Sequence, residues 1–537
     1  MGEKTDNKIK KNILIGGAWP YANSSLHLGH LAALLPGDVL ARYHRQIGNN
    51  VVYVSGTDCH GTPITIRAKK EGITPKEIAE RYHKEFSEVF EKMMFSYDLY
   101  TKTENEYHQE KVKELFKQMY DNGYIYGKDD MQPFCENCNK FLEDRELLLV
   151  CPSCGNITKG DMCDCGYEPR EEDFKDATCQ ECGNKVSFKA NKNLYLALSK
   201  LQPQIQEYVN ENKSHWRLAS QNESIKYLKE GLPDKAVTRN LDWGIDIPIP
   251  GYEDKRMYVW IEAVLGYLTT AQQVCLKYGW DWEDFWKKDH KNNVIYMVHG
   301  KDNITFHTII LPGLLLALND NYKLPDQMVA SQYLNINQEK ISKSKGNGIT
   351  ILDMIKNYDV DMIRYYFIAN GPEKKDSNFS IDEFIASSNS DVVNKYGNLI
   401  NRTLKYKGLE EIPNGKMDPK IKELIEKAYE DVSEMMESLE LRKAMDTIIK
   451  LVEDGNKYYE EKQPWKQEKE NIEEFNNTIF TCSNLIANLA NLLNPIMPNS
   501  SQKVRKLLNI EEANWEYIEI EQGLKLKGIE PLFEKIK

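Results

Sequence analysis

Eight of the eleven cysteines lie between residues 135 and 182 as close pairs, and this cluster limits the chain's fold more than any other feature. The pairs are Cys135 and Cys138, Cys151 and Cys154, Cys163 and Cys165, and Cys179 and Cys182. Thiolates at such spacing are typical of tetrahedral zinc sites, and eight suffice for two. Spacing alone does not indicate which pairs share an ion. The sequence predicts one or two structural Zn²⁺ ions, because four thiolates leave no open position for catalysis.

The cysteine cluster interrupts a chain that otherwise alternates strand-like and helical patterns. Residues 13–17 and 51–55 are short β-rich runs, and residues 28–47 between them have helical periodicity. Such alternation is the mark of a parallel α/β sheet. The pattern breaks from about residue 124 to 192 and resumes with strand-like runs near 257–260, 294–298 and 328–336. From about residue 382, Leu, Ile and Ala recur at three-and-four spacing, which predicts a helical final third.

Charge and hydropathy exclude several classes of protein. The chain has 70 basic and 82 acidic residues, a net charge of −12, so it does not bind nucleic acid through a global positive field. The longest apolar run, residues 309–318, is shorter than the roughly twenty residues that span a membrane. Residues 8–23 resemble no cleavable signal peptide. We therefore expect a cytoplasmic protein that does not contact a membrane.

The first chemical motif is His27-Leu28-Gly29-His30, between the first strand-like run and the first long helical pattern. Both imidazoles lie on one face of the first helical turn, where free N–H groups and the helix dipole favour an anion. Gly29 leaves room for a nucleotide close to the backbone. The arrangement suits a triphosphate, although two histidines at this spacing also occur as ordinary surface residues.

The second chemical motif is the loop of residues 340–347, KISKSKGN, which follows the last strand-like run. Its lysines, hydroxyl groups and glycine can surround phosphate oxygens and neutralise charge that develops during phosphoryl transfer. Such a loop also occurs as a solvated linker, so the motif is weak alone. The chain has no Gly-Lys-Ser/Thr P-loop, which removes the commonest alternative phosphate site.

Together the two motifs resemble the paired signatures of class I aminoacyl-tRNA synthetases, and their flanking residues resemble the methionyl-tRNA synthetase family. The matching segments fall in order along nearly the whole chain: PYANSSLHLGH at 20–30, GTDCHGTPI at 56–64, YVWIEA at 258–263, HGKD at 299–302 and DMIRYY at 361–366. The resemblance implies that ATP activates L-methionine to methionyl-adenylate and pyrophosphate. Methionine would then pass to the terminal ribose of tRNA(Met), including the initiator tRNA, for translation initiation and elongation.

The resemblance also implies the fold and its division into domains. The fold class is α/β: a Rossmann-like parallel-sheet catalytic domain with an inserted zinc-knuckle module and a C-terminal α-helical bundle. Residues 1–123 form the first half of the catalytic domain and residues 124–192 the zinc-binding connective module. Residues 193–335 complete the connective region and the catalytic domain, 336–381 hold the KISKS loop and a stem-contact region, and 382–537 form a helical anticodon-binding domain.

The resemblance assigns roles at the active site. His27, His30, Lys340 and Lys343 are the catalytic residues, and the ATP site consists of His27, His30, Gly300, Asp302 and Lys343, with Mg²⁺ accompanying ATP. Asp58 binds the methionine amino group. The methionine pocket is completed by Ala18, Trp19, Tyr21, Trp260, Ala263, Val264, Tyr267 and His307. The chain departs from the family at Trp19, where a smaller apolar residue is common, and at Glu262-Ala263-Val264, which replaces Asp-Ala-Pro. We expect both departures to change the pocket's shape but not its substrate.

The resemblance also assigns the tRNA contacts and the zinc pairing. Asn398 and Arg402 lie four residues apart on one helix face, and Trp465 is a stacking platform for an unpaired anticodon base. On sequence alone, Trp465 could equally pack the end of a helix. An inner zinc is bound by Cys151, Cys154, Cys163 and Cys165, and an outer zinc by Cys135, Cys138, Cys179 and Cys182. Cys163-Asp164-Cys165 departs from the family's spacing, because two intervening residues are usual there.

Other readings explain fewer of these features. The span from His30 to Lys340 is too short for the large editing insertion of the leucine, isoleucine and valine synthetases, and the cysteine enzyme's pocket residues are absent. A small-molecule nucleotidyltransferase with an HxGH turn would explain neither the KISKS loop nor the helical third. A non-catalytic zinc-ribbon RNA-binding protein or a decayed synthetase would have damaged signatures, whereas both histidines and both signature lysines are intact. We expect a monomer, because no appended dimerisation module is recognisable.

Overall fold

A five-stranded parallel sheet forms the centre of the structure, with strands in the order β14–β13–β1–β2–β3. This computed structural model describes residues 10–160, 163, 165, 167, 169–290, 292–340, 349–528 and 530–537. The strands are β1 (Asn12–Gly17), β2 (Asn50–Thr57), β3 (Leu99–Lys102), β13 (Asn293–Gly300) and β14 (Gln327–Ser331). In β1, Leu14 pairs with Val52 of β2 and Ile295 of β13. The expected α/β class with a parallel sheet is confirmed.

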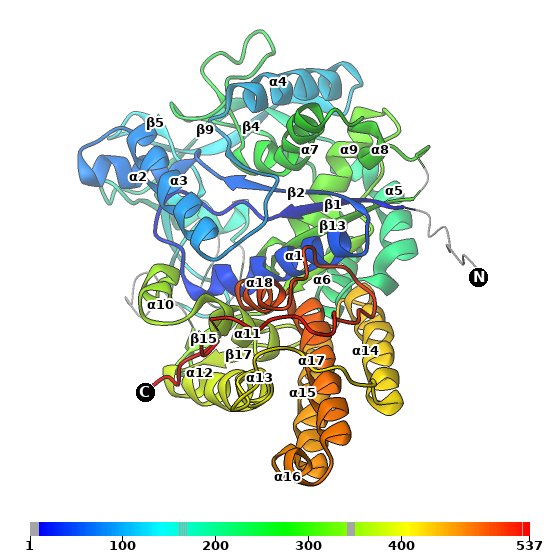
Figure 1. Ribbon diagram of the computed structural model, residues 1–537. Helices are drawn as coiled ribbons and strands as arrows, with labels where there is room; N and C mark the ends of the chain where they lie inside the picture. The colour runs from blue at the N-terminus through cyan, green and yellow to red at the C-terminus, as the bar shows by residue number, and fades with distance from the viewer. Residues whose placement is uncertain are drawn as a thin grey trace.

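Helices cover both faces of the sheet, so its strands are apolar on both sides. Ile13 and Ile15 pack into the core on the α1 side, whereas Leu14 between them packs into the core on the α7 side. The alternation follows from the two-residue period of a strand. Figure 1 shows α1 on one side of β1 and β2, and α7 and α9 on the other. The helices of this region are α1 (Leu28–Gln46), α2 (Thr62–Glu71), α3 (Pro75–Lys92), α4 (Glu106–Asp121), α5 (Leu198–Asn212), α6 (Leu218–Glu230), α7 (Val259–Tyr278), α8 (Glu283–Trp286) and α9 (Leu311–Leu318).

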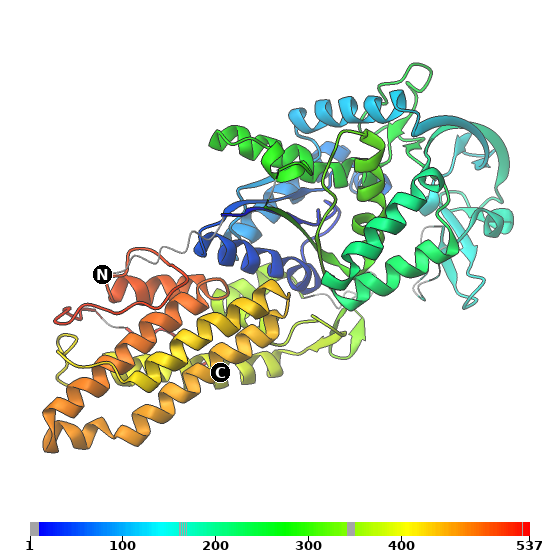
Figure 2. The ribbon, with the colours of Figure 1, turned by 90° about the vertical axis from the view of Figure 1, so that its right-hand side faces the viewer.

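The cysteine-rich insertion lies at the end of two long antiparallel strands, β4 (Ile125–Cys135) and β9 (Ser187–Leu196). Figure 2 shows these two strands curving away from the central sheet. Short strands complete the region: β5 (Lys140–Phe141), β6 (Leu147–Val150), β7 (Ile157–Lys159), β8 (Thr178–Cys179), β10 (Lys235–Ala236), β11 (Thr238–Arg239) and β12 (Arg256–Met257). The module has its own small apolar core, which includes Leu147, Phe174 and Val186. The predicted cysteine-rich insertion is therefore confirmed.

The final third is helical, as expected, and forms an elongated bundle that projects away from the sheet (Figure 2). It contains α12 (Ile381–Ser387), α13 (Asn398–Leu404), α14 (Pro419–Glu437), α15 (Leu441–Lys462), α16 (Pro464–Glu470), α17 (Ile472–Leu493) and α18 (Pro498–Leu507), with a π-helical stretch, Ser388–Gly397, between α12 and α13. Strands β15 (Leu334–Ile336), β16 (Glu339–Lys340) and β17 (Ser377–Phe379), with helices α10 (Ile351–Asn357) and α11 (Val360–Ala369), join the bundle to the sheet.

A buried ion pair connects the bundle to the α/β region. The Arg364 guanidinium of α11 donates to Asp38 Oδ2 of α1 at 2.6 Å, and both side chains are fully buried. Arg364 also donates to the carbonyl oxygens of Met93, Pro495 and Ile496. These five groups come from four separate parts of the chain, so the pair holds the two halves of the molecule together.

Within the described residues, none of the helices combines the length and the apolar character that crossing a membrane requires.

Candidate active site

The two histidines of the HLGH motif cap the first turn of α1 and hold each other in place. His27 is the N-cap residue, and its Nδ1 accepts a hydrogen bond from the Gly29 N–H at 3.1 Å. The Nδ1 of His30 accepts from the His27 N–H, also at 3.1 Å. Because each Nδ1 accepts, the proton of each neutral ring is on Nε2. Both rings can therefore donate to an anion at this helix N-terminus.

The segment that follows the KISKS loop is hydrogen-bonded to this turn. The Leu28 N–H donates to the Ile349 carbonyl at 3.2 Å, and the Ile351 N–H donates to the Leu26 carbonyl at 3.0 Å. Before the loop, the Lys340 backbone lies in β16 and pairs with Asn335 of β15. Lys343 lies outside the described residues. The loop thus begins in the short sheet of β15 and β16 and ends beside His27.

A cavity of about 360 Å³ opens at the carboxyl ends of β1, β13 and β14. Of the residues expected at the nucleotide and methionine sites, the structure places these on its wall: Ala18, Trp19, Tyr21, His27, His30, Gly300 and Asp302. Asp302 accepts a short hydrogen bond from the Tyr333 hydroxyl, another residue of the wall. Ligand sites of open parallel sheets lie at this edge. The cavity therefore brings the expected phosphate, ribose and amino-acid groups together.

A buried group of rings is formed by Tyr267 of α7, His299 of β13 and His307 of the π-helical segment Phe306–Ile310. The Tyr267 hydroxyl donates to His307 Nε2 at 2.8 Å, and His307 Nδ1 donates to the Asn303 carbonyl at 2.7 Å. Burial lowers the pKa of His307 to about 4, so the ring is neutral at pH 7. The His299 ring stacks on it with centroids 4.2 Å apart. Neutral rings of this kind suit an uncharged substrate side chain.

Other expected pocket residues lie on the first turns of α7. Trp260 packs edge-to-face on Phe306, with centroids 4.3 Å apart. Ala263 and Val264 are buried one helical turn further along. Trp19 is buried as well, and its indole lies between Gly56 of β2 and Gly266 of α7. A Cβ on either glycine would stand 2.6 Å from the Trp19 ring, so the absence of two side chains makes room for the indole.

Asp58 follows β2 and is 2% exposed. Its pKa is raised well above the usual range, first by burial and then by the nearby Glu262 carboxylate, while His60 acts in the opposite direction. Sequence reasoning missed His60, which lies within GTDCHGTPI without an assigned role. His60 Nδ1 contacts Glu262 Oε1 at 2.7 Å, and Nε2 makes a short contact with Glu104. In the sequence, only the histidine of GTDCHGTPI could have indicated this network, because Glu104 and Glu262 lie far from it and from each other along the chain.

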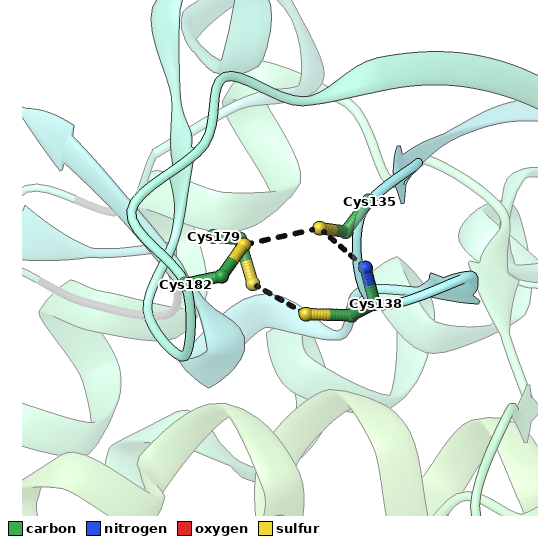
Figure 3. A group of neighbouring side chains, drawn as sticks. All are labelled: Cys135, Cys138, Cys179 and Cys182. Carbon is green, nitrogen blue, oxygen red and sulfur yellow. Dashed lines mark hydrogen bonds between the residues drawn. The ribbon is translucent and has the colours of Figure 1, made fainter.

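The eight cysteine sulfurs form two groups of four, in each of which the ligand atoms all lie within 4.8 Å of one another. Figure 3 shows one group, Cys135, Cys138, Cys179 and Cys182. The Sγ–Sγ distance is 3.4 Å between Cys135 and Cys182 and 3.9 Å between Cys138 and Cys179. The second group is Cys151, Cys154, Cys163 and Cys165, with corresponding distances of 3.7 and 3.5 Å. A tetrahedral zinc with Zn–S bonds of about 2.3 Å separates its sulfurs by about 3.8 Å. Both groups could therefore hold such an ion.

The residues expected at the anticodon lie near the far end of the bundle, on α13 and α16. Asn398 is exposed. The Arg402 guanidinium lies 4.1 Å from the centre of the Tyr459 ring and pairs with Glu460 at 2.6 Å. Trp465 is 42% exposed and also lies beside Tyr459, with ring centroids 6.3 Å apart. The structure thus groups Arg402 and Trp465 around Tyr459.

Comparison with known proteins gives consistent matches over the whole chain. Residues 13–404 match the family described as tRNA synthetases class I (M), and residues 411–537 match the anticodon binding domain of methionyl tRNA ligase. The methionine–tRNA ligase 1 of Alkaliphilus oremlandii is 47% identical over 530 residues, 98% of this chain and 97% of that protein. The methionine–tRNA ligase of Bacillus mycoides is 44% identical over 533 residues, with the same coverage.

A solved structure also resembles the chain as a whole. The Mycobacterium tuberculosis methionyl-tRNA synthetase in complex with methionyl-adenylate superposes with a TM-score of 0.80, covering 97% of this chain and 99% of that one. The two sequences are 24% identical, so this likeness shows the fold alone.

Proposed function

Because the chain belongs to the class I aminoacyl-tRNA synthetases specific for methionine, we propose that the HLGH histidines and the sheet-edge cavity form its methionine-activating site. The enzyme is a methionine–tRNA ligase. It joins methionine to ATP as methionyl-adenylate with release of pyrophosphate, and then transfers methionine to tRNA. The observation that carries our assignment of the site is the reciprocal capping of His27 and His30 at the first turn of α1: each Nδ1 accepts a backbone N–H, so that each neutral ring carries its proton on Nε2.

In the first step, a methionine carboxylate oxygen attacks the α-phosphorus of ATP, and the bond to the bridging oxygen of pyrophosphate breaks. His27 and His30 donate to phosphate oxygens, and Lys340 and Lys343 neutralise charge on the leaving pyrophosphate. Gly300 and Asp302 hold the ribose. Mg²⁺ accompanies ATP and shields its phosphate charge. No side chain forms a bond to the substrate, so positioning and charge neutralisation supply the catalysis.

Methionine is recognised by one charge and an apolar pocket. The Asp58 carboxylate pairs with the substrate ammonium group. Trp19, Trp260, Tyr267 and His307, with Ala18, Tyr21, Ala263 and Val264, surround the thioether, whose sulfur packs well against aromatic rings. Because the pocket contains neutral rings, a charged side chain would lose its hydration there without gaining a partner.

In the second step, a hydroxyl of the terminal ribose attacks the methionyl carbonyl, and AMP leaves. The helical bundle binds the tRNA that supplies this hydroxyl, including the initiator tRNA. Asn398 and Arg402 reach base edges of the anticodon, and Trp465 stacks on an unpaired base.

The two cysteine groups hold one zinc ion each in a structural role. Sets of four thiolates at these separations leave no position open for substrate. Both ions stabilise the module at the end of β4 and β9. The domain boundaries, the monomeric state and the cytoplasmic location stay predictions from the sequence.

The proposal is tested by charging purified tRNA(Met) with radioactive methionine, with the same tRNA carrying a replaced anticodon as the control. We expect esterification of tRNA(Met) and a strong loss with the altered anticodon, because the bundle contacts that loop. Equal charging of both tRNAs would remove the anticodon role, and no charging of either would contradict the assigned function.

A further inference from the structure

Three acidic side chains contact the buried His60, two at its ring and Asp58 at its backbone N–H, and only Asp58 has a role in the proposed reaction. His60 Nδ1 lies 2.7 Å from Glu262 Oε1, and Nε2 makes a short contact with Glu104. The His60 backbone N–H lies 3.4 Å from Asp58 Oδ1. His60 and Glu262 are fully buried, and the second Glu262 oxygen has no protein partner within the described part of the chain. Asp58 and His60 follow β2, Glu262 lies on α7, and Glu104 lies in the segment before α4.

With Glu262 and Glu104 both ionised, His60 donates from both ring nitrogens. An ionised carboxylate only accepts hydrogen bonds, so a ring between two carboxylates must carry a proton on each nitrogen. Burial lowers the pKa of His60, but Glu262 and Glu104 outweigh this effect and raise it to about 10. The neighbouring His108 is neutral, because burial and the His60 charge lower its pKa to about 3. His60 is therefore the cation of this buried cluster.

The position of the ring is fixed by the residues around it. Trp243 packs edge-on against His60 with centroids 5.3 Å apart, and its Nε1–H donates to the Cys59 carbonyl at 2.7 Å. Glu104 also accepts from the Gln109 amide at 3.0 Å. Glu262, Glu104 and Trp243 thus hold the imidazolium in place, two residues along the chain from Asp58.

A cation here changes what Asp58 can do. Without it, Asp58, Glu104 and Glu262 would place three negative charges in one buried site, and like charges at short range favour protonation of one of them. A protonated Asp58 could not pair with an ammonium group. With the cation present, the charges of Glu104 and Glu262 are partly compensated.

We propose that His60 is a positioning residue for methionine: its charge opposes the effect of Glu262 and Glu104 on Asp58, which favours the ionised carboxylate that pairs with the substrate ammonium group. The inference rests on the proposed role of Asp58. Glu262, which stands where the family commonly has Asp, supplies the carboxylate that holds the Nδ1 side of the ring. His60 itself does not touch the substrate.

The test compares His60→Gln with the double variant His60→Gln/Glu262→Gln in methionine-dependent pyrophosphate exchange. We expect His60→Gln to raise the KM for methionine about tenfold or more, with the KM for ATP nearly unchanged, since one pKa unit is a tenfold change. Adding Glu262→Gln removes one uncompensated charge and should recover part of the loss. A double variant whose KM for methionine is as high as that of His60→Gln, or higher, would overturn the proposal.

A second readout separates charge from packing. Binding of 4-(methylthio)butanoate, which is methionine without its amino group, is followed by the fluorescence of the pocket tryptophans. The affinity for this analogue should be equal in wild type and His60→Gln. If His60→Gln weakens binding of methionine and of the analogue equally, His60 has only a structural role. The control is His44→Gln, which removes another buried histidine, one bonded to Tyr296 far from the cavity. It should leave both ligands' binding unchanged.

Asp58→Asn distinguishes failure of this inference from failure of the proposed site. If Asp58→Asn leaves methionine binding intact, the role of Asp58 itself is wrong. If Asp58→Asn weakens methionine binding but His60→Gln does not, only the role of His60 is wrong.

Discussion

At the residue scale, a tryptophan fits at position 19 because the two residues that lie against its ring, Gly56 and Gly266, have no side chain. Gly56 and Gly266 come from β2 and α7, and a Cβ on either would overlap the indole. The departure from the family at Trp19 therefore depends on residues 37 and 247 positions away in the sequence. The Trp19 indole thus supplies apolar surface on the wall of the cavity.

We predict that Gly266→Ala weakens methionine binding. Alanine normally stabilises a helix interior over glycine by about 1 kcal/mol, but here its Cβ would displace the Trp19 ring. The KM for methionine in pyrophosphate exchange should rise, and adding Trp19→Leu should restore it because the smaller side chain makes room. A more stable Gly266→Ala enzyme with an unchanged KM would refute this packing.

We predict that Lys343→Ala slows adenylate formation severely while methionine still binds. The lysine belongs to the KISKS loop and acts on phosphate charge that the amino acid does not carry. Pyrophosphate exchange and equilibrium methionine binding measure the two effects separately. Unchanged exchange in the variant would remove Lys343 from the mechanism.

Residue roles could be predicted only where neighbours in sequence are neighbours in space. His27 and His30 lie in one helical turn, so their motif indicated an anion site directly. His60, Glu104 and Glu262 converge from three elements, and their contacts depend on how α7 packs on the sheet. No local pattern indicates such a cluster, which is why the sequence singled out Asp58 and left His60 without a role.

At the scale of elements, the zinc-binding module is a small domain that can barely bury a core. Its apolar cluster includes Cys135 and Cys179, so two sulfurs of one group are part of its packing. The module reaches the body through β4 and β9. If each cysteine group holds zinc, as proposed, metal binding would supply a large share of the module's folding free energy.

We predict two zinc ions per chain, each lost with its own cysteine group. Cys179→Ser should lower the zinc content to about one per chain, and Cys154→Ser should do the same through the other group. Native mass spectrometry measures the content directly. A single ion in the unaltered protein would show that the narrow Cys163–Cys165 spacing prevents binding, and two ions in both variants would contradict the grouping.

We predict that Trp465→Ala impairs tRNA charging but spares pyrophosphate exchange. Stacking on a base is worth about 1–3 kcal/mol, which corresponds to a roughly 5- to 150-fold loss in kcat/KM for tRNA. Trp280→Ala is the matched control, because this indole is 38% exposed but lies beyond the end of α7. Equal losses in both assays would mean that Trp465 only packs the end of the helix.

At the scale of the whole molecule, the Arg364–Asp38 pair joins the sheet region to the bundle. The DMIRYY segment contains Arg364, and Asp361 in the same segment accepts from the Ser500 N–H at 2.5 Å. The segment that resembled the family in sequence thus serves the junction between two domains. Its partners lie more than a hundred residues away on either side, so only the fold reveals the role.

We predict that Asp38→Asn destabilises the protein by about 3–5 kcal/mol, because it leaves the buried Arg364 without its counter-charge. Burial raises the pKa of Asp38, but Arg42 and Arg364 outweigh this and lower it to about 2, from 3.8. A lowered pKa gives stability that is present above about pH 4 and is lost as the pH falls towards 2. Urea unfolding between pH 7 and pH 3 measures both effects.

The control for this variant is Asp121→Asn, which breaks an exposed pair with Lys117 and should cost less than about 1 kcal/mol. Equal unfolding free energies of the two variants would show that the buried pair contributes no more than a surface one.

The architecture could be largely predicted from the sequence, because strand and helix periods are local. The parallel sheet, the cysteine-rich insertion and the helical third are all present. Ile13, Leu14 and Ile15 alternate between two cores, on opposite faces of the sheet. The sequence could not predict this alternation, because a strand that is covered on both faces is a run of apolar residues without polar ones between them. The course of β4 and β9 depends on long-range pairing, which sequence periods do not specify.

We expect the enzyme to activate methionine, and no other amino acid, in the cavity at the carboxyl ends of β1, β13 and β14. The most direct measurement is ATP–pyrophosphate exchange with each of the twenty amino acids in turn, on zinc-replete protein and without tRNA. Our account predicts exchange with methionine and none of comparable rate with the other nineteen. Exchange driven mainly by another amino acid would show that Trp19 and Val264 have remade the pocket, and no exchange with any would contradict the assignment of the site.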